Sequence, residues 1–304
     1  MTALAGIDPA AFVDAEAARV ERALAAVAES VLAAVPGPLH DPVRYALETR
    51  GKRLRPVLCC AAYRALRGEP PEAAYRLACA VEVVHTYSLV HDDLPCMDDD
   101  DLRRGRPTVH RVFGVARAVL AGAALLPAAA AVLDAEGAAL GLLPAERGRL
   151  VAALCSAAGA EGMVGGQLLD LEGEGAETDA RGLERIHRAK TGALLAAALR
   201  LGGIAARATP GELRGLAGYG EALGLAFQIV DDVLDVTAPS SALGKTAGKD
   251  LSSAKSTYPA LFGVEGARRL AGERIREARD ALAGAGVRSP ELEALAGYVL
   301  DRER

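Results

Sequence analysis

The chain has 304 residues, of which 51% are hydrophobic, 25% charged and 4% aromatic, a composition typical of globular proteins rather than disordered ones. Its net charge of −5 and the absence of a basic tail argue against nucleic-acid binding, which requires a dense positive surface. No linker or shift in composition divides the chain, so we expect a single domain over residues 1–304.

The N-terminal segment is not typical of a signal peptide. It lacks a basic start and carries Asp8, Asp14 and Glu16 where a signal peptide needs an apolar core. The five cysteines contain no C-x-x-C pair that would suggest zinc or a redox site. We therefore expect reduced thiols and a cytoplasmic location.

Apolar residues recur at three- and four-residue spacing along most of the chain, which predicts helices. The clearest runs are Ala17–Val35, Val57–Leu66, Leu77–Val90 and Leu150–Leu171. Breaks rich in Gly, Pro and charged residues separate the runs, and strand-like alternation is almost absent. The predicted fold class is all-α, with a single large bundle of roughly ten or more antiparallel helices.

The most apolar stretch is Val119–Leu133, which contains Pro127. It is too short to cross a bilayer, so we expect no membrane span and interpret it as a buried core helix. Leu150–Ala160 and Ala193–Ala206 are apolar nearly all round, which fits either contact with a second subunit or dense internal packing.

Two aspartate clusters each follow an apolar helical run. In the second cluster, Asp231 and Asp235 lie four residues apart and so project from one helix face, with Asp232 beside them. Like charges placed in this way destabilise a helix, and a divalent cation removes that penalty.

The first cluster has a different geometry. Asp92 and Asp98 lie six residues apart and would point to different sides of an ideal helix. Pro95 disfavours helical geometry at Leu94, so we predict that the helix ends or bulges there and that the loop returns Asp98 toward Asp92.

Carboxylate clusters without His or Cys suit a hard ion, and Mg²⁺ shared with substrate phosphates is a usual occupant of such sites. One cluster alone is equally typical of a solvated acidic turn, but two together favour a metal site. The chain also has two basic segments. RGKRLRP (50–56) precedes an apolar helix, and LRRGRP (102–107) directly follows the first aspartates. Arg forks and Lys charges of this kind bind diphosphates.

These segments resemble the motifs of a known family. The motifs are, in order, GKRLRP, YSLVHDDLPCMDDDDLRRGRPT, GMVGGQLLDL, LERIHRAKTGAL, LGLAFQIVDDVLDV, LGKTAGKD and KSTYPALFG. From about Tyr45 to nearly the C-terminus the chain resembles the all-trans polyprenyl diphosphate synthases, most closely the bacterial short-chain farnesyl and geranylgeranyl diphosphate synthases. The resemblance implies the isoprenoid synthase fold, a helical bundle around a central cavity, and a homodimer.

The resemblance also implies roles for individual residues. Three Mg²⁺ ions would be held by Asp92, Asp98 and Asp231, supported by Asp93, Asp232 and Asp235. The site for isopentenyl diphosphate would comprise Gly51, Lys52, Arg55, His85 and Arg104. The allylic diphosphate would contact Arg103, Lys190, Thr191, Gln228 and Lys245, with Lys255 as a further candidate. His85 by itself is more typical of a core histidine, and only the motif around it makes it a candidate ligand. We interpret Gln167, Asp170, Tyr258 and Pro259 as structural.

The implied reaction is a Mg²⁺-assisted ionisation, condensation and elimination that joins isopentenyl diphosphate to dimethylallyl or geranyl diphosphate. Tyr87, five residues before Asp92 and followed by the small Ser88, implies a floor to the cavity and farnesyl diphosphate as product. Geranylgeranyl diphosphate stays the alternative, because Ala123, Pro127 and Ala130 depart from the family pattern in a helix that shapes the cavity.

Two rival functions are considered. A class I terpene cyclase shares the first aspartate motif, but it lacks the second diphosphate site that GKRLRP indicates and uses different ligands in its second metal motif. A non-catalytic subunit of a heteromeric prenyl synthase loses the aspartates, whereas both sets are complete in this chain.

Overall fold

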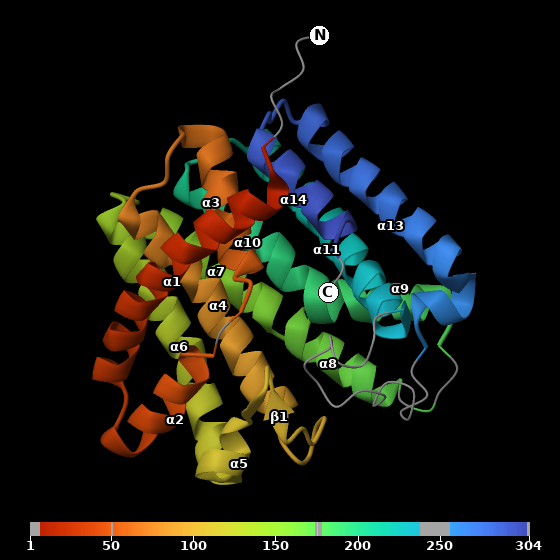
Figure 1. The fold of residues 1–304 in the computed structure, drawn as a ribbon. Coiled ribbons are helices and arrows are strands. Elements are labelled where there is room, and N and C mark those ends of the chain that lie inside the picture. Colours follow the sequence, from red (N-terminus) through yellow and green to blue (C-terminus); the bar gives the residue numbers. More distant parts are fainter. Residues whose placement is uncertain (1–6, 50, 174, 176–177, 238–255, 303–304) are drawn as a thin grey trace.

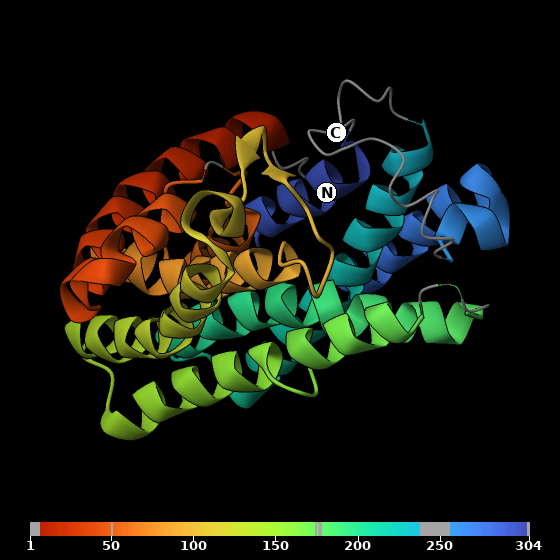
Figure 2. The same ribbon diagram turned by 90° about the horizontal axis from the view of Figure 1, so that it is seen from below.

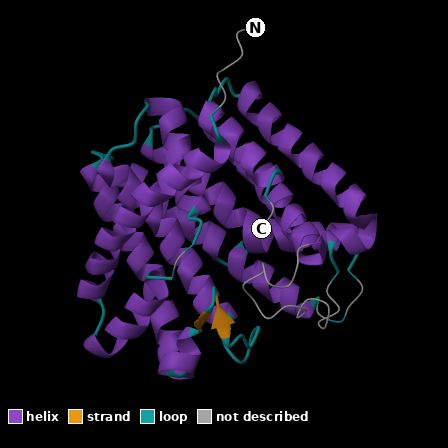
Figure 3. Ribbon diagram, in the orientation of Figure 1, coloured by secondary structure: helices purple, strands orange, loops and turns teal. Residues whose placement is uncertain are grey.

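The computed structural model describes residues 7–49, 51–173, 175, 178–237 and 256–302. Within these ranges the chain is almost entirely helical, as predicted (Figure 3). The helices are α1 (Pro9–Ala34), α2 (Gly37–Leu47), α3 (Leu54–Arg67), α4 (Glu72–Asp92), α5 (Val109–Phe113), α6 (Val115–Ala139), α7 (Pro144–Ala158), α8 (Met163–Glu172), α9 (Ala180–His187), the π-helical turn η1 (Arg188–Gly192), α10 (Ala193–Ala205), α11 (Pro210–Thr237), α13 (Tyr258–Gly284) and α14 (Pro290–Leu300). A short hairpin joins β1 (Leu102–Arg103) to β2 (Arg106–Pro107).

Several helix starts follow directly from sequence. Asp8, Thr257 and Ser289 precede α1, α13 and α14, and each side chain accepts a hydrogen bond from a backbone N–H of the first turn. A proline occupies the first or second position of each of these helices, where no backbone donor is needed.

Two long helices organise the bundle (Figure 1). The helix α4 packs against α1, α3, α6 and α10, and most of its residues are buried, which explains its apolar character on nearly all sides. The helix α11 packs between α10 and α13. Both run toward the lower part of the molecule in Figure 1, so their aspartate-bearing C-terminal ends lie at the same end of the fold.

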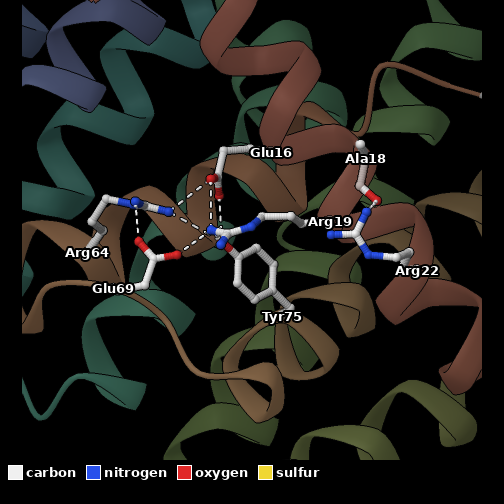
Figure 4. Close-up of polar contacts among 7 residues, drawn as sticks. All are labelled: Glu16, Ala18, Arg19, Arg22, Arg64, Glu69 and Tyr75. Atoms are coloured by element: carbon white, nitrogen blue, oxygen red, sulfur yellow. Dashed lines mark hydrogen bonds and ion pairs between the residues drawn. The ribbon is translucent and has the colours of Figure 1, made fainter.

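A buried polar cluster fastens α1 to α3 and α4 (Figure 4). The carboxylate of Glu16, which is 5% exposed, accepts hydrogen bonds from Tyr75 Oη at 2.8 Å and from Arg64 Nη2 at 2.9 Å. Arg19 donates to Tyr75 Oη at 2.7 Å and pairs with Glu69. A buried carboxylate requires partners of this kind, so the cluster defines how α1 lies across α3 and α4.

The helix α6 differs from the expectation drawn from its apolar centre. It continues through Pro127 and, by length and composition, is long enough and apolar enough to cross a membrane. Only 39% of its most apolar window is buried. Ala118, Ala121 and Leu125 are buried, whereas Val119 and Leu120 are exposed. The helix is thus longer than its apolar centre, but a single helix of this kind is weak evidence for a membrane span. The interpretation as a core helix holds for one face only.

Candidate active site

The first aspartate motif begins where α4 ends. Asp92 is the last residue of α4, and the amide of Leu94 still donates to the carbonyl of His91 at 3.1 Å. The chain then turns back, so that the amide of Asp98 donates to the carbonyl of Asp92 at 2.8 Å. This confirms the predicted end of the helix near Pro95 and the return of the loop.

The environment of Asp92 favours a bound cation. Burial raises the pKa of Asp92 to about 6, the charge of Lys190 opposes that shift, and the charge of Asp98 adds to it. The half-buried carboxylates of Asp92 and Asp98 therefore repel each other, and a divalent ion between them would remove that repulsion.

The donor set fits Mg²⁺. It consists of carboxylate oxygens, and among the residues that the structure describes no three His, Cys, Asp or Glu side chains are gathered around one point. Mg²⁺ commonly takes one or two carboxylates and completes its shell with water and substrate phosphates. Asp92 and Asp98 on one side and Asp231 on the other would therefore hold the ions together with the bound diphosphate.

Asp93 has a different role from its neighbour. It is 3% exposed and accepts hydrogen bonds from Arg103 Nε at 2.9 Å and from Arg103 Nη2. Arg103 lies on β1, and the hairpin turns through Arg104 and Gly105, both with positive φ. Two such residues form the turn that best joins twisted antiparallel strands, so the local sequence R-R-G-R shapes the loop that presents Arg103 and Arg104.

The second aspartate motif lies on α11, as predicted. Asp231 and Asp235 are one turn apart on this continuous helix. Asp232 is 6% exposed and accepts hydrogen bonds from the amide of Tyr258 at 3.0 Å and from Gln228 Nε2 at 3.3 Å. Asp232 thus anchors the start of α13, and the prediction that Tyr258 is structural fits this position.

The chain end brings a residue to this motif that the sequence analysis missed. Arg302 follows α14, and its Nη2 lies 2.9 Å from Asp231 Oδ1. Its side chain is 9% exposed, and its guanidinium carbon lies 4.1 Å from the centre of the Phe227 ring. No motif surrounds Arg302, and only the packing of α14 on α11 places it here.

Lys190 and Thr191 lie in η1, a π-helical turn of the kind often found at functional sites. This turn packs closely between α8 and α11, and glycines make the close approach possible. A Cβ at Gly166 would collide with the backbone of Lys190, and one at Gly224 with that of Gly192. Lys190 Nζ lies 2.7 Å from Asp170 Oδ2, and Thr191 Oγ1 donates to Gln228 Oε1 at 2.9 Å.

Two residues interpreted as structural are also candidates for the site. Asp170 orients Lys190, a contact that its opposite charge could have suggested. Gln167 is 6% exposed, and neither polar atom of its amide has a partner within the described part of the chain. A buried amide without partners is a candidate contact for substrate or water.

The basic residues form a second group. The guanidinium of Arg104 lies against Gly51, where a Cβ would collide with it. Burial lowers the pKa of Arg55, and its buried Nε has no hydrogen-bond partner among the described residues. Burial, followed by the charges of Arg55 and Arg104, also lowers the pKa of His85, which keeps its ring neutral. An incoming anion would satisfy these donors.

Other predicted residues are placed as follows. Lys52 is exposed in the loop before α3, and Ser88 is buried with its Oγ donating to the carbonyl of His85 at 2.9 Å. Lys245 and Lys255 lie outside the described residues. A groove of about 950 Å³ on the other side of η1, lined by Leu168, Arg185 and Arg188 among others, contains none of the predicted site residues.

The acidic and basic groups act on one another across the site. The charge of Lys190 opposes the raised pKa of Asp92, and the charge of Asp231 opposes the lowered pKa of Arg55. Carboxylates from α4 and α11 therefore lie near cations from η1 and α3. This arrangement suits two phosphorylated substrates and the ions that neutralise them.

Comparison with known proteins agrees with this geometry. A model of the family described as polyprenyl synthetase matches residues 37–283. The chain is 47% identical over 272 residues to heterodimeric geranylgeranyl pyrophosphate synthase large subunit 1, chloroplastic, of Arabidopsis thaliana, covering 88% of this chain and 73% of that protein.

Solved structures share the whole fold. An apo FPP/GFPP synthase from Zymomonas mobilis matches with a TM-score of 0.75 and 37% identity, covering 93% of this chain and 99% of that one. A geranyltransferase from Helicobacter pylori, complexed with magnesium and isoprenyl diphosphate, matches with a TM-score of 0.78 and 30% identity, covering 95% and 96%. The predicted isoprenoid synthase fold is confirmed, and the chain belongs to the polyprenyl synthetase family.

Proposed function

We propose that this prenyltransferase condenses isopentenyl diphosphate with dimethylallyl and geranyl diphosphates and stops mainly at farnesyl diphosphate. The class of reaction follows from the family. The choice of farnesyl diphosphate depends on one observation, the position of Tyr87 beneath the first aspartate motif.

Two groups of site residues would each bind one of the two substrates. Arg103, Lys190 and Gln228 would contact the allylic diphosphate, and the basic group around Arg55 and Arg104 would hold isopentenyl diphosphate beside it. Asp92, Asp98 and Asp231 would hold the Mg²⁺ ions, three by the family resemblance, which when bound would supply Lewis-acid stabilisation of the leaving pyrophosphate. Lys190 and Arg103 would add preorganised positive charge where the negative charge develops as the allylic C–O bond breaks.

The later steps need little from the protein. The double bond of isopentenyl diphosphate attacks the allylic cation, and a proton is lost to the departing pyrophosphate. Apolar walls exclude water that would otherwise capture the cation. The hydroxyl of Thr191, which donates to Gln228, leaves an oxygen lone pair that can face the cation.

Tyr87 lies on α4 beside His91, which contacts α6. It is half-buried, and its ring lies edge-on to that of His91 with 4.7 Å between centres. His91 Nε2 lies 3.1 Å from the carbonyl of Val119 on α6. Burial, and then the charge of Asp92, raise the pKa of Tyr87, so its ring lies within the electrostatic reach of the metal site. A rigid aromatic in this position supports a floor for a short product.

One observation favours geranylgeranyl diphosphate instead. The Arabidopsis relative carries that product in its name. Of the residues that depart from the family pattern in α6, Ala123 and Pro127 are exposed and Ala130 is half-buried, so Ala130 is the main candidate for altering the cavity.

The test is product analysis by mass spectrometry with each allylic primer. We expect the wild type to release mainly farnesyl diphosphate. Tyr87→Ala should shift the products to twenty carbons or more with turnover retained within about tenfold, because the ionisation site is untouched. Tyr63→Ala, at a half-buried tyrosine on α3, is the matched control and should keep the wild-type products.

Each other outcome has a definite meaning. Mainly geranylgeranyl diphosphate from the wild type would favour the alternative product. Unchanged products from an active Tyr87→Ala variant would place the floor elsewhere, and cyclic or no products would contradict the synthase function itself.

We also propose a homodimer that buries the outer face of α6 and α8. Exposed apolar side chains gather on these helices, including Val115, Leu120, Val164 and Leu168, and α6, α7 and α8 lie along one edge of the molecule in Figure 2. Apolar patches of this kind are typical of subunit interfaces. The Arabidopsis relative is named as one subunit of a heterodimer, which supports dimerisation through a chain of this type.

A cytoplasmic location is proposed from the cysteines. Cys96 and Cys155 are exposed and free, and unpaired surface thiols suit a reducing compartment.

A further inference from the structure

A buried ion pair lies behind the basic group. Arg53, which is 3% exposed, donates from Nη1 to Glu82 Oε1 at 2.7 Å, from Nε to Glu21 Oε1 at 2.7 Å and from Nη2 to the carbonyl of Thr49 at 2.8 Å. Glu82 lies on α4 and is 3% exposed. The pair therefore ties the turn before α3 to both α1 and α4 and is itself withdrawn from any substrate.

The turn that this pair holds is strained. Arg53 has φ 50° and ψ 30°, in the left-handed region that residues with a side chain seldom adopt. Such a conformation persists where surrounding contacts over-determine it, and it occurs disproportionately at functional sites. The three hydrogen bonds of the Arg53 guanidinium are contacts of this kind.

A second strained turn meets the first. Arg104 has φ 52°, and its guanidinium lies directly against Gly51. Gly51 is two residues before Arg53, and Arg55 is two residues after it. A change at Arg53 therefore displaces the loop on which Gly51 and Arg55 are carried relative to Arg104.

Glu82 also balances the charges of the basic group. Burial lowers the pKa of Arg55, Glu82 counteracts that shift, and the neighbouring Arg104 adds to it. Burial also lowers the pKa of Arg104, and the charge of Glu82 counteracts that shift. His85 lies three residues after Glu82 on α4, so this buried carboxylate adjoins His85 along the helix as well as acting on Arg55 and Arg104.

We propose that Arg53 and Glu82 are positioning residues for isopentenyl diphosphate: their buried pair holds the turn that aims Gly51, Arg55 and Arg104 at one diphosphate. This inference rests on the proposed assignment of that group to isopentenyl diphosphate. Neither residue touches the substrate. Their loss would act on one substrate only, since Lys190 and Arg103 are held separately by Asp170 and Asp93.

The experiment replaces both partners at once, as R53M/E82L. Removing one partner leaves a buried charge without compensation, whereas replacing both by apolar residues of similar size is often neutral for stability. We expect KM for isopentenyl diphosphate to rise about tenfold or more, with KM for geranyl diphosphate and kcat within about threefold of wild type. Arg53→Lys, which keeps the charge but loses the three-donor fork, should raise the same KM by a smaller factor.

The matched control is R64M/E16L, which replaces the buried pair of Figure 4 that joins α3 to α1 away from the site. It should leave both KM values unchanged, even where it lowers the melting temperature. If R53M/E82L does not fold, Arg53→Lys carries the test.

Different variants test the positioning role and the assignment of the basic group to isopentenyl diphosphate. Arg55→Ala should raise KM for isopentenyl diphosphate alone, and an equal effect on both substrates would overturn the assignment. If Arg55→Ala behaves as expected but R53M/E82L and Arg53→Lys leave that KM unchanged, or change both KM values equally, the positioning role is wrong.

Discussion

At the scale of single residues, neighbouring aspartates perform different tasks. Asp92 and Asp231 lie in the proposed metal site, whereas Asp93 holds Arg103 and Asp232 holds the start of α13. Successive helical residues point about 100° apart, so two adjacent carboxylates on one helix cannot serve one ion equally. The D-D doublet in each motif therefore combines a proposed ligand with a structural anchor.

Asp170 and Lys190 give a prediction at this scale. Lys190→Ala should raise KM for the allylic diphosphate far more than KM for isopentenyl diphosphate, because it removes a charge-assisted contact to one substrate. Asp170→Asn should act in the same direction by a smaller factor, since Lys190 loses the carboxylate that orients it. Steady-state kinetics with each substrate varied in turn measures both effects.

Arg188→Ala is the control, because Arg188 lies in the same turn but pairs with Glu184 at 2.7 Å and lines the groove on the other side. It should keep both KM values. If KM for the allylic diphosphate is unchanged in Asp170→Asn, the role of Asp170 is purely structural.

At the scale of elements, the ends of helices build the site. The end of α4 supplies Asp92, η1 supplies Lys190, and the residues after α14 place Arg302 on Asp231. Arg302 thus places a cation on a carboxylate that the proposed mechanism needs for Mg²⁺. A metal ion bound at Asp231 would compete with the Arg302 guanidinium for this carboxylate.

Arg302→Ala should therefore strengthen metal binding to the substrate-free protein. If the ion pair between Arg302 and Asp231 contributes about 1.4 kcal/mol, it lowers the affinity of a competing metal ion about tenfold. Titration with Mn²⁺, followed by electron paramagnetic resonance, measures the affinity without any turnover. Arg279→Ala, which breaks an exposed pair between α13 and α14, should leave it unchanged. Equal or weaker Mn²⁺ binding by Arg302→Ala would show that the pair does not oppose the metal.

At the scale of the whole molecule, one face stays apolar. The helix α6 buries one side against α4 and exposes Val119 and Leu120 on the other. In the proposed homodimer, a second copy of the chain would bury this face by symmetry.

Light scattering tests this association. We expect the wild type to be a dimer at micromolar concentration and Leu120→Glu to shift it toward monomer, because a charge at the centre of the contact loses its water on association. Leu261→Glu, at a leucine on α13 that is 41% exposed, should stay dimeric. A monomeric wild type, or its association with lipid vesicles, would contradict the proposed interface.

The sequence by itself determined the class of fold, the two metal motifs and the chemistry of the substrates. Helical periodicity and breaks are local properties, so the all-α bundle follows from them. Pro95 acts within its own loop, which made the return of Asp98 to Asp92 predictable. The order of the motifs was sufficient for the family.

Only the tertiary structure decided which side chains meet. The contacts of Arg302 with Asp231, of Glu82 with Arg53 and of Lys190 with Asp170 join segments far apart in the chain. The length of α6 and its exposed face were likewise missed, because a proline and an apolar run look the same in a fully buried helix and in one with an exposed face. Burial depends on which helices pack together, and packing is a property of the whole chain that periodicity in one segment does not contain.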